Sequence, residues 1–307
     1  MSEPHHAGNR PARYREVVLQ ALARLSGGDT HAATLHRART HLRRLQACCE
    51  LAGEDRRATS IARCVVRVSK LRTLQVFAHY LKRHGAPRSD RKAVKRRLRA
   101  AHEKLERTHA YEAIERIVRR QALPPVPADP AWLAERMQAA RDAHAGTLRR
   151  LTAEAGATPR RKTLHQLRLL IKSIRYQEEW AMDFPFAQPG LIRRLKRAQA
   201  ALGDYEDLFQ FRKLARSMNL RSSSAIEKAW RMARTRARAL SVRLIDYLGE
   251  WRVRASGLSS TRFHRDRSLG RLLDLPKILH ALVEVPMMLS VCDVCNRTRH
   301  WFPRETV

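Results

Sequence analysis

Two segments that lie 129 residues apart in this chain carry the same pattern. The first reads Thr-Leu-His-Arg-Ala-Arg from Thr34, and the second reads Thr-Leu-His-Gln-Leu-Arg from Thr163. In both copies a basic residue follows the histidine after three and after seven positions, and a glutamate, Glu50 or Glu179, closes the match. An internal repeat of this kind predicts two similar halves in a pseudo-twofold arrangement.

The sequence around the repeat has helical periodicity. Apolar residues recur at spacings of three and four, with little strict alternation. With only 12 glycines and 13 prolines, the chain is poorly suited to a turn-rich β architecture. We expect helices over about residues 12–25, 31–52, 56–83, 89–121, 130–155, 158–182, 191–218 and 222–251. The sequence therefore predicts an all-α protein with two antiparallel four-helix bundles that flank a basic groove.

A proline-rich segment separates the two copies of the repeat. Four prolines fall within seven positions, and such a segment cannot continue a helix. We therefore expect a first bundle half over 1–123, a linker over 124–130 and a second bundle half over 131–255. The tail over 256–307 changes character after Gly257, and no structure is predicted for it.

The charge of the chain favours a polyanionic partner. The 307 residues include 62 Lys and Arg against 29 Asp and Glu, for a formal net charge of +33. Hydrophobic residues make up 44%, which is enough for a core and excludes a fully disordered chain. Strong self-repulsion is relieved by nucleic acid, inorganic polyphosphate or an anionic membrane surface. No run approaches the roughly 18 apolar residues of a membrane span, and no signal peptide is recognised, so we expect a cytoplasmic protein.

The repeat places cations along one side of each helix. On a helix, a sector of about 80° that borders the apolar stripe holds His36, Arg39, Arg43 and Gln46, and the first three are basic. We call these three residues the first row, and the second row consists of His165, Arg168, Lys172 and Arg175. Rows at the border of a packed face are expected to line a groove between helices. Arginine offers a fork of donors to phosphate oxygens, and histidine gains charge as the pH falls.

An alternative is that the row arginines bridge structural carboxylates. We expect Glu179 to pair with Arg175, four residues earlier, whereas Glu50 has no such arginine in its own half. Because acids are outnumbered two to one, this alternative is not expected to account for both rows. The rows are therefore predicted to bind a phosphate polymer.

These residues resemble the CHAD domain, the conserved histidine α-helical domain. The resemblance covers about residues 12–250 and is closest over 163–176 and over the Leu-Gly-Asp-Tyr-Glu-Asp-Leu segment at 202–208. The first half is a looser match, since Gln46 stands where the family has an arginine, and Thr73 and Gln75 stand where it has acids. The resemblance implies a basic channel that binds inorganic polyphosphate without catalysis. No Glu-x-Glu-x-Lys motif of a fused triphosphate tunnel domain is present, so the chain resembles a stand-alone copy.

The rows and the resemblance together define a predicted polyphosphate site, which includes Lys196 and Arg197 from the basic cluster at 193–197. The set is His36, Arg39, Arg43, Arg44, Lys70, Arg72, His165, Arg168, Lys172, Arg175, Tyr176, Lys196 and Arg197. Nucleic-acid binding is the alternative function. Single-stranded nucleic acids bind by stacking on aromatic side chains, and the set offers only Tyr176. Weak nucleic-acid binding, association with polyphosphate granules and an unidentified partner enzyme of phosphate metabolism are further expectations.

We expect no enzyme activity, no cofactor and no bound metal. The sequence has no phosphate-binding P-loop, nucleophile elbow or His-Glu-x-x-His motif. Cys292, Cys295 and His300 offer three ligands without the second pair of a structural zinc site. The basic run at 91–99 spreads around its helix, which indicates a generic solvated surface.

Overall fold

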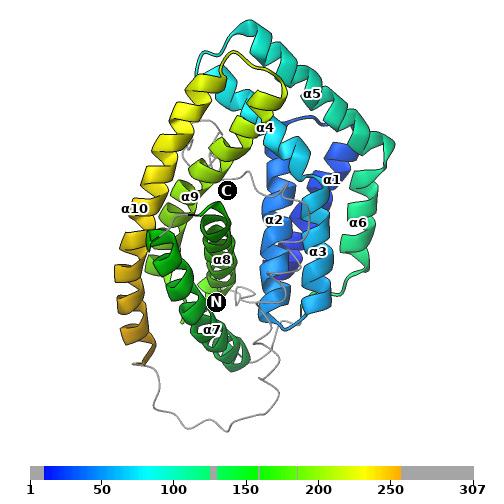
Figure 1. Ribbon diagram of the computed structural model, residues 1–307. Coiled ribbons are helices and arrows are strands. Elements are labelled where there is room, and N and C mark those ends of the chain that lie inside the picture. Colours follow the sequence, from blue (N-terminus) through cyan, green and yellow to red (C-terminus); the bar gives the residue numbers. More distant parts are fainter. Residues whose placement is uncertain (1–9, 125–129, 158–159, 185, 257–307) are drawn as a thin grey trace, which may run out of the picture.

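The computed structural model describes residues 10–124, 130–157, 160–184 and 186–256, with the side chains of 130 and 241–256 left out. All regular structure in these ranges is helical, which confirms the all-α prediction. The α-helices are α1 (Arg10–Ser26), α2 (Ala32–Leu51), α3 (Asp55–Arg67), α4 (Ser69–Arg83), α5 (Arg88–Arg107), α6 (Ala110–Arg120), α7 (Pro130–Ala157), α8 (Arg161–Trp180), α9 (Pro189–Ser217) and α10 (Ser223–Ser256) (Figure 1). Nearly the whole predicted tail, with Cys292, Cys295 and His300, lies outside the described residues.

Two of the predicted helices are each divided into two. The first break lies at Val68, between α3 and α4, where the Ser69 hydroxyl donates a hydrogen bond of 2.7 Å to the carbonyl of Val65. The second lies between α5 and α6, where His109 adopts a left-handed φ of 45° that an α-helix cannot continue. The predictions of single helices over 56–83 and 89–121 were therefore wrong, because apolar spacing resumes after each break and hides it.

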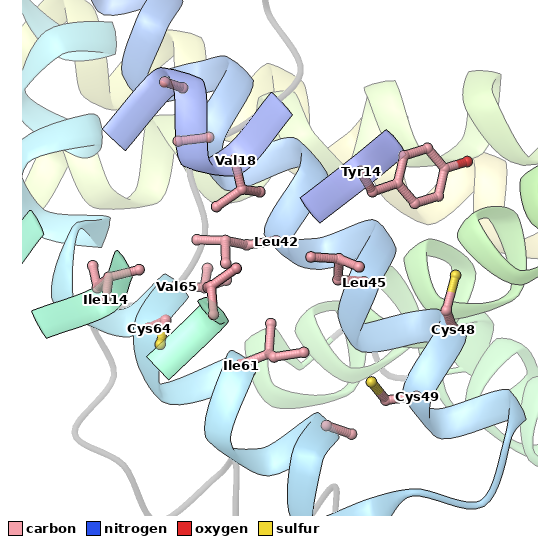
Figure 2. Packing of buried hydrophobic residues seen from close by; sticks show 14 of the residues in the cluster. Tyr14, Val18, Leu42, Leu45, Cys48, Cys49, Ile61, Cys64, Val65 and Ile114 are labelled. Atoms are coloured by element: carbon pink, nitrogen blue, oxygen red, sulfur yellow. The ribbon is translucent and has the colours of Figure 1, made fainter. Parts of the chain in front are cut away.

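One hydrophobic core lies among α1, α2, α3 and α6. Figure 2 shows Val18 of α1, Leu42 of α2, Val65 of α3 and Ile114 of α6 directed toward one another. All four are buried, as the amphipathic pattern of these helices requires. This core holds α2, the helix of the first row, in place.

A second core joins α8, α9 and α10 with elements from elsewhere in the chain. Phe77 of α4 is fully buried there and stacks on Phe211 of α9, with the ring centroids 4.9 Å apart. Helix α7 contributes Leu133 to the first core and Leu148 to the second. The two cores are thus not divided at the proline-rich segment, since α4 precedes that segment and packs with the helices that follow it.

The two helices that carry the repeat pack against each other. Helix α2 contacts α8, and it also contacts α4, while α8 contacts α9. The two helices that carry the rows therefore lie side by side (Figure 1). Within the described ranges, no helix has the length and apolar character needed to cross a membrane.

Candidate functional site

The rows of α2 and α8 face the interior of the protein. Arg39 is 4% exposed and Arg168 is fully buried, and Lys172 and Arg175 are also buried. His36, Arg43 and His165 keep part of their surface accessible. The rows were expected to line a groove between helices, and the structure shows that neighbouring helices bury several of their members.

The first row is covered by the start of α4. The Arg39 guanidinium donates a hydrogen bond of 3.2 Å from Nη2 to the hydroxyl of Ser69. Arg72, one turn further along α4, is 2% exposed and donates to the carbonyl of Ala32 at 3.2 Å. Arg72 thereby contacts α2, the helix of the first row, across the interface between α2 and α4.

Gln46 connects the first row to a carboxylate. Arg43 Nη1 donates to the side-chain oxygen of Gln46 at 2.9 Å, and the Gln46 amide donates to Glu50 at 2.7 Å. The glutamine, which departs from the family pattern, thus stands between a cation and an acid. It relays a hydrogen bond where an arginine would have added a charge.

Carboxylates accompany the second row. His165 Nδ1 lies 3.6 Å from Glu206 of α9, and Arg161 of α8 donates to the same carboxylate at 2.7 Å. The predicted pair of Arg175 with Glu179 is confirmed at 3.8 Å, and the Arg175 guanidinium also lies over the ring of Tyr176 at 4.3 Å. Structural carboxylates therefore lie beside more residues of the second row than the low number of Asp and Glu residues in the chain led us to expect.

The cations of both rows influence one another at Arg43. Burial, together with the charges of Arg39 and Arg168, lowers the pKa of Arg43 to about 10, against the opposing effect of Tyr176 and Glu50. Arg168 belongs to the second row, so the electrostatic field of one half acts on a side chain of the other. An anion bound beside Arg43 would favour its charged form.

The remaining predicted residues lie on two other surfaces. Arg44 and Lys196 flank Glu179 at 3.1 and 3.8 Å and line a pocket of about 1,090 Å³ between α1, α2 and α9. Arg197 is exposed on α9. Lys70 is exposed as well, and it lines a smaller pocket on another side of α4.

The larger pocket is also lined by residues of α1 that were not predicted as part of a site. Arg10 and Arg13 line it together with Arg37 and His41 of α2. His41 donates from Nδ1 to the carbonyl of Arg37 at 2.9 Å and accepts from Arg44 at 3.0 Å, which orients Arg44 toward Glu179. Burial, with the charge of Arg44, lowers the pKa of His41 to about 4 against its hydrogen bond to Arg37. No repeated motif marked Arg10, Arg13 or His41, so only packing reveals their place in this pocket.

The comparisons agree with the resemblance noted in the sequence. The family model of the CHAD domain matches residues 12–216, a range that holds both rows and the helices that cover them. No curated protein matches the chain.

Proposed function

The chain belongs to the CHAD domain family, and on that premise we propose that it binds inorganic polyphosphate without transforming it. The CHAD domain is associated with polyphosphate binding in general. The observation that supports this function most directly is the meeting of the two rows at Arg43, where cations of α2 and α8 act on one another. A linear phosphate chain offers closely spaced negative charges to such a region.

The half-buried members of the rows make the direct contacts in this proposal. His36, Arg43 and His165 keep accessible surface, whereas Arg39 and Arg168 lie behind them. A buried charge acts through a medium of lower dielectric constant than water, so its field is screened less. The buried arginines therefore strengthen the attraction without touching the ligand.

The exposed cations on α9 and elsewhere extend this attraction over the surface. Lys196 and Arg197 lie on the outer face of α9, and Lys196 borders the larger pocket. A long chain reaches both the rows and such surfaces, whereas orthophosphate occupies one contact at a time. Binding should therefore strengthen with chain length and weaken steeply with salt, because each phosphate contact releases counterions. Association with polyphosphate granules is part of the same proposal.

The test compares two double variants that remove the same charge. Arg43→Gln with Lys172→Gln changes one cation in each row. Arg91→Gln with Lys92→Gln is the control, because both side chains are exposed on α5 and line neither pocket. Arg43 contacts the ligand in this proposal, and a lost charge-assisted hydrogen bond costs about 1.5–3 kcal/mol. The buried Lys172 adds the loss of its field, so the row variant should bind long polyphosphate at least about tenfold more weakly. The control should differ little from wild type.

Arg43→Lys separates a loss of binding from a loss of folding. It keeps the charge at this position, so it should retain more affinity than Arg43→Gln when both variants have wild-type helical content by circular dichroism. Equal affinity of a folded row variant and the control would contradict the rows as the site. Tighter binding of DNA or RNA than of polyphosphate, at matched phosphate concentration, would instead favour nucleic-acid binding.

A further inference from the structure

Lys70 and Arg72 are two residues apart on α4 and take part in different surfaces. Successive residues of a helix turn by about 100°, so these two side chains leave the helix about 160° apart. Arg72 is 2% exposed and faces the first row, whereas Lys70 is exposed and borders a second pocket of about 410 Å³. Lys70 was predicted as part of the row site, and the structure places it elsewhere.

Four cations from three helices line this second pocket, which we call the Lys70 pocket. They are Arg67 of α3, Lys70 of α4, and Arg97 and Lys104 of α5. Arg97 and Lys104 are seven residues apart, which puts them on one face of α5. Of the basic run at 91–99, which we interpreted as a generic surface, Arg97 is the residue that lines this pocket.

The described residues that line the Lys70 pocket carry positive charge without a carboxylate among them. Within the described part of the chain, none of the four cationic side chains forms a hydrogen bond or an ion pair. Like charges in a hollow with apolar walls repel one another and raise the local potential, which draws in anions.

The walls of the pocket decide which anion it suits. Leu71, Leu105 and the small side chains of Ala100 and Ala101 form the apolar part of the lining. Its volume lies in the range of small-molecule sites, about 300–1,000 Å³. No aromatic side chain lines the pocket, so nucleic-acid bases have nothing to stack on.

We propose that the Lys70 pocket is a second anion site that binds a condensed phosphate chain separately from the rows. Its two arginines present paired donors to phosphate oxygens, and its two lysines add compact charges. The inference takes only the class of ligand from the proposed function. It assigns Lys70 to a partner set of Arg67, Arg97 and Lys104 in place of the rows.

Occupancy of the pocket can be measured at Lys70 and Lys104, because both lysines can be acylated. Full-length protein is treated with a limiting acylating reagent, with and without tripolyphosphate, and modification is read at each lysine by mass spectrometry. At a ligand concentration about ten times the Kd, a site is about nine-tenths occupied, so both lysines should react about tenfold more slowly. Lys92 and Lys95, exposed on the same helix outside the pocket, should be unaffected.

Matched variants leave the reporters in place. Arg67→Gln with Arg97→Gln removes both arginines of the pocket and should abolish the protection of Lys70 and Lys104. Arg96→Gln with Arg99→Gln removes the same charge from exposed positions of α5 and should preserve it. The proposed site would be contradicted if tripolyphosphate did not slow acylation of Lys70 and Lys104 in wild type, or if it slowed acylation of Lys92 and Lys95 equally.

Two further arms separate this inference from the proposed function. The row variant Arg43→Gln with Lys172→Gln should keep full protection of Lys70 and Lys104, and a loss of protection there would show that the pocket is not a separate site. If long chains bind through the rows and no lysine of the pocket is protected, only this inference fails. Equal protection by an oligodeoxythymidylate at the same phosphate concentration would overturn the assignment to a condensed phosphate chain.

Discussion

Ser173 on α8 donates a hydrogen bond of 2.8 Å to Glu50 on α2, from the repeat position that Arg44 holds in the other copy. Arg44 in turn donates to Glu179, the repeat equivalent of Glu50, at 3.1 Å. The same two repeat positions of each helix thus contact those of the other helix, which is the reciprocal pairing that a twofold axis produces. The halves differ in charge at this point, because Arg44 places a cation beside Glu179 and Ser173 gives Glu50 only a neutral donor.

Glu50→Gln should gain stability relative to wild type as the pH rises. Burial raises the pKa of Glu50, against the hydrogen bonds from Ser173 and Gln46 and the charge of Arg43. The Glu50 carboxyl therefore stays protonated in the folded protein above pH 4.5, where it is already ionised in the unfolded chain. The stability that this group contributes is lost as the pH rises through its folded pKa. Urea unfolding from pH 4 to 7 measures the difference. Glu135→Gln, at an exposed site on α7, should show no such trend, and a pH-independent Glu50→Gln difference would contradict the assignment.

Phe77→Ala should destabilise the second core although Phe77 belongs to the first half of the sequence. The side chain is fully buried against Phe211 of α9, and removing it leaves a cavity that costs about 3–5 kcal/mol. Chemical denaturation gives the loss, and hydrogen exchange should accelerate in α9. Phe77→Leu, which fills more of the space, should lose less. Acceleration confined to α1, α2 and α3 would show that α4 is not part of this core.

Asp90→Asn should weaken the attachment of α5 to the turn before α10. The buried carboxylate accepts from the backbone N–H of Arg221 at 3.2 Å and from the N–H and hydroxyl of Ser222 at 2.8 and 2.7 Å. Burial raises the pKa of Asp90, but these hydrogen bonds outweigh it and the net pKa is lowered. A lowered pKa means that ionised Asp90 stabilises the folded state above pH 3.8, and this stabilisation is lost as the pH falls through the folded pKa. Asp90→Asn should therefore reduce the free energy of unfolding by about 1–3 kcal/mol at pH 7 and by less in acid.

Thermal unfolding at pH 7 and pH 3 checks the Asp90 prediction. Asp142→Asn is the matched control, because Asp142 is exposed and, among the described residues, accepts only from Gln138, at 3.2 Å. An equal loss in both variants at pH 7 would mean that Asp90 adds nothing beyond an exposed acid.

Polyphosphate affinity should rise between pH 8 and pH 6 if His36 and His165 contact the ligand. Imidazole gains its charge over this range, and a phosphate favours the charged form. His36→Gln with His165→Gln should flatten the pH dependence. His31→Gln with His84→Gln removes two exposed histidines outside the rows and should leave it unchanged. Isothermal titration at each pH measures the slopes, and parallel slopes for wild type and the row variant would make both histidines structural.

The helical class and the repeated histidine helices followed from the sequence because both depend on spacing within a continuous segment. Periodicity shows which side of α2 or α8 is apolar, and the repeat shows that Arg39 and Arg168 are equivalent in type and place. The ends of helices at residues 68 and 109 did not follow, because each depends on one backbone conformation that apolar spacing does not record.

Which helix covers which face was decided only by tertiary structure. Spacing places a row at the border of an apolar stripe. It does not say that Ser69 will accept from Arg39, that Glu206 will lie beside His165, or that Arg39 and Arg168 will be buried. Packing between residues far apart in the chain also placed Phe77 of α4 in the second core and Lys70 beside α5. A local pattern carries the direction of a side chain relative to its own helix, whereas exposure depends on every other helix that lies against it.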